Sequence, residues 1–121
     1  MTDTIKGGCF CSAIRYEFAK ADVPVANCHC SMCRRTSGAP FVTWLVVPID
    51  SFSYTQGEPK QLQSSDDGTR YFCDACGTPI ACINRTHPEI IDITLGSLDT
   101  PEDFTPTFDV FEDTRLPFLA E

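Results

Sequence analysis

The sequence lacks a long hydrophobic run. Its longest apolar stretch, residues 41–47, is far too short to cross a bilayer, and residues 1–8 contain no apolar core of a signal peptide. We therefore expect a cytoplasmic protein that is neither secreted nor embedded in a membrane.

Basic residues are also scarce. Nine Lys and Arg stand against 17 Asp and Glu, so the formal net charge is −8. Phosphate backbones and anionic lipids are bound by clusters of Lys and Arg, and this chain has only one basic doublet, Arg34-Arg35. The composition predicts no nucleic acid partner and no membrane partner.

No segment shows the apolar periodicity of a long helix. Alternating or β-branched residues instead predict short strands. Residues 34–40 have no apolar period and are expected to form a loop, and one helical turn is expected at residues 101–103. At 121 residues, we expect a single domain spanning residues 1–121. The predicted fold is mainly β, a small sandwich or open barrel with little helix. Its strands are expected at residues 13–19, 23–28, 41–47, 52–56, 62–65, 69–73, 79–84, 90–96 and 107–111.

The eight cysteines are the most informative residues of the chain. Thiols stay reduced in the cytoplasm, so a cysteine-rich chain there favours metal binding over a disulfide framework, which is the alternative. Cysteines two residues apart in an extended segment point to the same face, and such a pair offers two sulfurs to one ion. The spacing therefore predicts metal-binding knuckles that stabilise the β fold.

Two cysteine pairs can form one closed site. Cys9 and Cys11 are a C-x-C pair, and Cys73 and Cys76 form a C-x-x-C-G knuckle whose turn brings two sulfurs together. Four thiolates complete a tetrahedron around zinc, and structural zinc replaces part of the core in small domains. We predict a structural zinc site at these four residues.

A third group differs because it has only three cysteines. Cys28, Cys30 and Cys33 lie within six residues and leave no partner pair elsewhere. Zinc with three protein ligands keeps a fourth position for water or a substrate thiol, as catalytic zinc sites do. We predict a catalytic zinc at these residues. His29 lies between two ligands and is expected to point away from the metal.

Alternatives remain at two points. Cys82 lies in a predicted strand, where a lone cysteine is usually a small buried hydrophobic residue. Its alternative role is that of a fourth metal ligand beside Cys28, Cys30 and Cys33. Four thiolates also suit iron. Zinc is favoured because it needs no redox partner. His87 precedes a proline among polar residues and is expected in an exposed loop.

Three motifs in this order resemble the glutathione-dependent formaldehyde-activating enzyme family, also called the centromere-protein-V-like family. They are Gly7-Gly8-Cys9-Phe10-Cys11, Cys28-His29-Cys30-Ser31-Met32-Cys33-Arg34-Arg35 and Tyr71-Phe72-Cys73-Asp74-Ala75-Cys76-Gly77-Thr78. The resemblance implies a mostly β fold, two zinc ions per chain at the two cysteine groups, and a carbon-sulfur lyase. The implied reaction adds glutathione to formaldehyde and gives S-(hydroxymethyl)glutathione.

Glutathione and a small aldehyde are thus the expected small-molecule partners. Arginine binds carboxylates through two parallel hydrogen bonds, so the basic doublet and the loop after it are candidate contacts for glutathione. These candidates are Arg34, Arg35, Ser37 and Gly38. The competing hypotheses are a non-catalytic zinc-binding module that contacts a protein, and a redox or metal-sensing protein.

Overall fold

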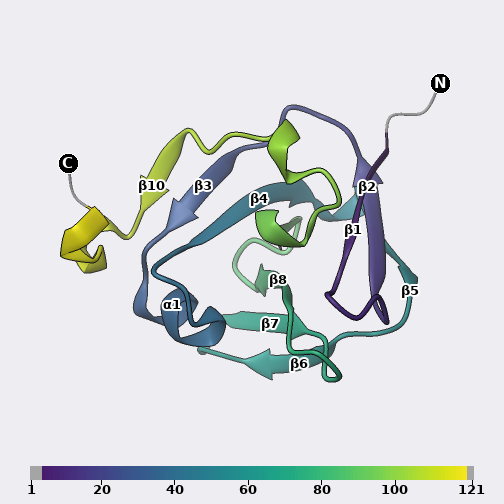
Figure 1. Ribbon diagram of the computed structural model, residues 1–121, viewed down its shortest axis with the longest axis horizontal. Coiled ribbons are helices and arrows are strands. Elements are labelled where there is room, and N and C mark those ends of the chain that lie inside the picture. The colour runs from purple at the N-terminus through teal and green to yellow at the C-terminus, as the bar shows by residue number, and fades with distance from the viewer. Residues whose placement is uncertain (1–3, 120–121) are drawn as a thin grey trace.

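The computed structural model describes residues 4–119 and is mainly β, as predicted (Figure 1). The strands are β1 (Thr4–Gly8), β2 (Arg15–Ala19), β3 (Val25–Cys28), β4 (Val42–Pro48), β5 (Phe52–Gln56), β6 (Lys60–Gln63), β7 (Gly68–Phe72), β8 (Pro79–Asn84), β9 (Ile90–Thr94) and β10 (Phe108–Val110). One α-helix, α1 (Ser31–Ser37), is present in the described part. The 3-10 turns are η1 (Ile49–Ser51), η2 (Leu95–Ser97), η3 (Pro101–Asp103), η4 (Glu112–Thr114) and η5 (Pro117–Leu119). None of the described helices is long and apolar enough to cross a membrane.

The strands form two sheets. The smaller has the order β1-β2-β5, and the larger has the order β10-β3-β4-β9-β8-β7-β6. Its neighbours pair antiparallel except for β10 and β3, which pair parallel. Figure 1 shows α1 beside the curved larger sheet, between the β3–β4 and β6–β7 strands of that view.

Alternation along the central strands separates a core face from a site face. Leu45 and Ile93 are fully buried and pack in the main core together with Tyr16 and Phe18 of the smaller sheet. Side chains of a strand alternate between its two faces, so Trp44 of β4 and Asp92 of β9 lie on the opposite face. This second face is the one that carries the three-thiol group.

Helix α1 corrects the prediction of a loop over residues 34–40. The Cys30 sulfur caps the helix by accepting a hydrogen bond from the Cys33 N–H at 3.3 Å, and Gly38 ends it in the left-handed conformation. The helix has two turns and buries only Cys33, so its sequence carries no apolar stripe. Strand β1 was not predicted either. A side chain at Gly7 would collide with the Tyr16 hydroxyl, so glycine is needed where β1 crosses β2.

Gly38→Ala is expected to lower the free energy of unfolding by about 1 kcal/mol, because alanine is strained in the left-handed region that Gly38 occupies at φ 72°. No atom lies within 4 Å of the added methyl group, so backbone strain is the sole cost. Urea denaturation measures the loss. The matched control is Gly96→Ala, which also meets no atom but needs no positive φ, and which should change the value by about 0.5 kcal/mol or less.

Candidate metal centres and the adjoining cavity

The structure brings the four cysteines of the predicted closed site together. The sulfurs of Cys9, Cys11, Cys73 and Cys76 all lie within 4.8 Å of one another. Adjacent sulfurs are 3.7 Å apart for Cys9 and Cys11, and 3.8 Å apart for Cys11 and Cys73. Tetrahedral zinc with bonds of about 2.3 Å requires sulfurs about 3.8 Å apart. The donor set therefore fits a tetrahedral zinc ion.

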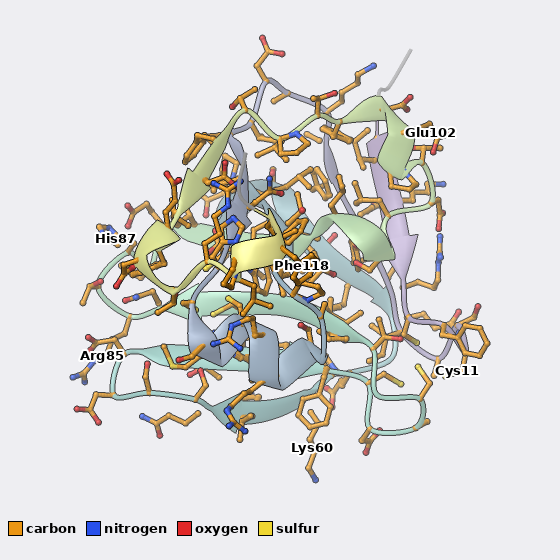
Figure 2. All side chains as sticks on the ribbon, turned by 60° about the vertical axis from the view of Figure 1, so that its left-hand side comes forward. Cys11, Lys60, Arg85, His87, Glu102 and Phe118 are labelled. Atoms are coloured by element: carbon orange, nitrogen blue, oxygen red, sulfur yellow. The ribbon has the colours of Figure 1, made fainter. Side chains whose placement is uncertain are left out.

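The first pair of thiols lies in a turn and not in the extended segment that the C-x-C spacing suggested. The Cys9 N–H donates to the Ile14 carbonyl at 3.1 Å, and Ser12 has a positive φ of 68°. The Ile14 N–H also donates to the Cys9 sulfur at 3.3 Å. Figure 2 shows Cys11 at the edge of the molecule, on the side opposite His87. The tight turn, and not strand alternation, aligns these two sulfurs.

The second pair lies in the knuckle after β7. The Gly77 N–H donates to the Cys73 carbonyl at 2.7 Å, and Gly77 has a φ of 84° that favours glycine. The Thr78 hydroxyl lies 3.2 Å from the Cys76 sulfur, and this contact lowers the pKa of Cys76 to about 5. The same hydroxyl accepts a hydrogen bond from the Phe10 N–H at 3.1 Å. Thr78 thus links the two halves of the four-thiol group and favours the thiolate form of Cys76.

The second group combines the end of β3 with the start of α1. Cys28 ends the strand, Cys30 caps the helix and Cys33 lies in its first turn, and their sulfurs are within 4.8 Å of one another. The Cys28 and Cys33 sulfurs are 3.3 Å apart. This contact lowers the pKa of Cys33 to about 5 and raises that of Cys28. The group already stabilises one thiolate, which is the form that binds metals.

Arg70 contacts this group, although the sequence gave no sign of it. Its two terminal nitrogens lie 3.6 and 3.7 Å from the Cys33 sulfur, and its Nε donates to the Ser64 hydroxyl at 3.0 Å. The guanidinium also lies over the Trp44 ring, 6.0 Å from its centre. These contacts hold a cation beside clustered thiols. In the sequence, Arg70 is only a polar residue in an alternating strand, and nothing connects it to Cys33.

The three-thiol group faces a cavity of about 310 Å³. Its wall is mostly apolar and includes side chains of α1, β3, β4 and β10. Cys82 lines the cavity but does not belong to the three-thiol group, and burial raises the pKa of its thiol to about 11. The polar side chains in the wall, apart from the three cysteines and Cys82, are Ser64, Ser65, Arg70, Asn84 and Asp92.

The residues proposed for glutathione do not line this cavity. Arg34, Arg35 and Gly38 line a separate depression with Leu116. Ser37 lines a neighbouring cavity of about 290 Å³, which shares Trp44 and Arg70 with the first.

The two histidines occupy unlike environments. His29 is buried, and its Nε2 lies 2.8 Å from an Asp109 carboxylate oxygen and outside the three-thiol group. This contact lowers the pKa of Asp109 and ties β10 to the segment that carries the cysteines. His87 is exposed, as predicted.

Comparison with known proteins finds the family that the cysteine motifs resemble. A model of the glutathione-dependent formaldehyde-activating enzyme family matches residues 4–114. A Halomonas elongata protein named "Putative glutathione-dependent formaldehyde-activating enzyme" is 26% identical in an alignment of 106 positions that covers 79% of this chain. An uncharacterised lyase of Schizosaccharomyces pombe is 30% identical in an alignment of 92 positions that covers 74% of this chain. Each alignment spans 66% of the relative, so the chain covers slightly less than two thirds of their length.

The fold has a counterpart among solved structures. A crystal structure of a Rhodobacter sphaeroides protein superposes with a TM-score of 0.68 and 24% identity, covering 87% of this chain and 99% of that one. The family match spans nearly all of the described residues and agrees with the cysteine motifs. The chain belongs to the glutathione-dependent formaldehyde-activating enzyme family.

Proposed function

We propose that this protein is a zinc-dependent carbon-sulfur lyase that adds glutathione, or a related thiol, to formaldehyde and forms S-(hydroxymethyl)glutathione. The observation that carries the proposal is the three-thiol group, which opens on a cavity and has Arg70 against its Cys33 sulfur. Both the family and the names of the relatives agree with such a lyase. A reducing cytoplasm suits it, because the thiols would stay free there.

Two zinc ions per chain are part of the proposal. Cys9, Cys11, Cys73 and Cys76 would hold a structural ion, and Cys28, Cys30 and Cys33 would hold a catalytic one. A zinc ion with three protein ligands supplies a position at which a thiol binds and loses its proton near neutral pH.

The chain's own residues would bind and orient the substrates. Arg70 places positive charge beside the Cys33 sulfur, which offsets the accumulation of negative thiolates and favours an anionic thiol. The protein as a whole is acidic at −8, so an anionic substrate gains little from its overall field and depends on this local cation. The apolar cavity wall, including Trp44 and Val110, limits water around the reacting groups.

Arg70→Met is expected to weaken glutathione binding about 10- to 100-fold, because the charge-assisted contact beside Cys33 is lost while most of the apolar stem remains. Isothermal titration with glutathione measures the change. The variant for comparison is the double variant Arg34→Ala with Arg35→Ala, whose side chains line a separate depression. The arginine doublet remains a predicted contact for the carboxylates of glutathione. If the double variant loses more affinity than Arg70→Met, the doublet is the main contact and the role given to Arg70 is wrong.

The reaction itself is tested by exchange spectroscopy on glutathione with ¹³C-formaldehyde. The protein is expected to accelerate interconversion of free formaldehyde and the hydroxymethyl adduct, and zinc-depleted protein is expected to lose that acceleration. An exchange rate equal to that of buffer, with two zinc ions bound, would sink the lyase and favour the non-catalytic binding module.

A further inference from the structure

The face of the larger sheet that carries the three-thiol group also carries a carboxyl group, Asp92, to which the proposed reaction gives no role. Asp92 lies in the middle of β9, and its cross-strand partners are Val46 of β4 and Cys82 of β8. Cys82 in turn pairs with Arg70 of β7. Directly opposed residues of neighbouring strands share a face of the sheet. Asp92, Cys82 and Arg70 therefore form one row across the wall of the three-thiol cavity, which all three line.

Within residues 4–119, no hydrogen bond or ion pair explains why the Asp92 carboxyl group is buried. Its Oδ1 is buried and makes no hydrogen bond, and no ion pair in the described residues includes this carboxyl group. Buried carboxyl oxygens are normally paired, because an unpaired one is destabilising. Asp99 shows the ordinary arrangement, with a bidentate ion pair to Arg15 on the surface. A carboxyl group kept unpaired in a cavity wall is typical of functional residues.

We propose that Asp92 is a catalytic residue that exchanges a proton with the reacting oxygen of the substrate. This inference rests on the proposed lyase function and adds an acid-base group to it. In the forward direction, the thiolate sulfur bonds to the carbonyl carbon and the carbonyl electron pair moves onto oxygen. Asp92 gives that oxygen its proton and becomes a carboxylate. The proton released by the next thiol restores the acid, so no other reactant is needed.

The surroundings of Asp92 suit this role. Burial, with the Cys33 thiolate adding to it, raises the pKa of Asp92 to about 6, so its acid form persists close to neutral pH. The charged and titratable groups around it are Cys33 on α1, Arg70 on β7, Cys82 on β8 and, after β8, His87, while β4 contributes the uncharged Trp44 and Val46. A general acid works best when its pKa lies near the working pH.

Asp92→Asn tests the proposal because the amide keeps the shape of the side chain but cannot transfer a proton. The turnover number for adduct formation is expected to fall about 100-fold. Glutathione affinity and zinc content are expected to stay within twofold of wild type. The limb near pH 6 in the wild-type profile of turnover against pH should disappear. The matched control is Asp99→Asn, outside the cavity, which should retain turnover and the pH 6 limb.

Stability gives an independent readout with a definite sign. Because the pKa of Asp92 rises from its ordinary 3.8 to about 6 in the folded state, this side chain lowers the stability as the pH rises between these two values, and the loss is complete above about pH 6. Asp92→Asn should therefore raise Tm at pH 7.5, and this gain should vanish near pH 4, where wild-type Asp92 is neutral. Asp99 has a pKa lowered by its bond to Arg15, so Asp99→Asn should lower Tm at pH 7.5 instead.

The outcomes separate this proposal from the one on which it rests. Wild-type turnover and an unchanged pH profile in Asp92→Asn would overturn the role of Asp92 while leaving the lyase intact. A lower Tm or lost zinc in Asp92→Asn would also overturn it, because Asp92 would then be structural. A wild-type protein that forms no adduct would instead sink the lyase proposal itself.

Discussion

Cys30→Ser is expected to reduce zinc from two ions to one per chain and to lower the rate of adduct formation at least about 1,000-fold. Removing one of three thiolates leaves too few strong ligands at the site that faces the cavity. The substitution must remove the metal ligand without disrupting α1, because the Cys30 sulfur also caps that helix. Serine is a preferred capping residue, so the substitution removes a metal ligand while the helix keeps its cap.

Two measurements separate loss of metal from loss of fold in this variant. Elemental analysis counts the zinc, and far-UV circular dichroism with a thermal scan shows whether the sheets remain. The control is Cys82→Ser, which changes a thiol of the same cavity outside the three-thiol group and should keep both ions. One zinc remaining in Cys82→Ser would identify Cys82 as a fourth ligand. Full activity in Cys30→Ser would contradict the catalytic assignment.

Cys73→Ser is expected to have the largest effect on stability, a loss of about 4 kcal/mol or more. The four-thiol group joins cysteines separated by 62 positions in the chain, and it ties the turn after β1 to the knuckle after β7. Structural zinc contributes its binding energy to folding, and serine is a poor replacement for a thiolate ligand. Cys73 is also nearly fully buried, at 1% exposure, so water cannot replace the lost ligand easily.

The expected loss corresponds to a fall in Tm of about 20 °C for a domain of this size. Differential scanning calorimetry of the zinc-loaded proteins measures it, with Cys30→Ser as the control, since loss of the other ion should lower Tm far less. A Tm for Cys73→Ser within about 3 °C of wild type would mean that the four-thiol group does not hold a structural metal.

Local patterns predicted much of this molecule. Most strands follow alternation or β-branched runs, and the core face of β4 and β9 follows from the same alternation. The three-thiol group and each pair of the four-thiol group were predicted from short spacings, because residues a few positions apart must lie close together. The two pairs, 62 positions apart, were joined because a closed zinc site needs four ligands. The family was predicted for the same reason, since its motifs are local, and the family model matches.

Other features depend on contacts between distant parts of the chain. Helix α1 was missed because its cap is a cysteine sulfur and it buries a single residue. Arg70 contacts Cys33 although 37 positions separate them in the chain. Asp92 lies in the cavity wall because the pairing of β8 with β9 places it opposite Cys82. Arg34 and Arg35 were predicted as glutathione contacts because they follow Cys33 in sequence, and that contact stays a prediction. On a helix, successive side chains point in different directions, and these two line another surface.

The proposed reaction requires that the three-thiol group hold a zinc ion with an exchangeable position. Zinc-edge X-ray absorption during a glutathione titration tests it most directly. Averaged over one group of four thiols and one of three, we expect 3.5 sulfur ligands per zinc without glutathione and 4 with it. Four sulfurs per zinc from the start, unchanged by glutathione, would show two closed sites and rule out the exchangeable position.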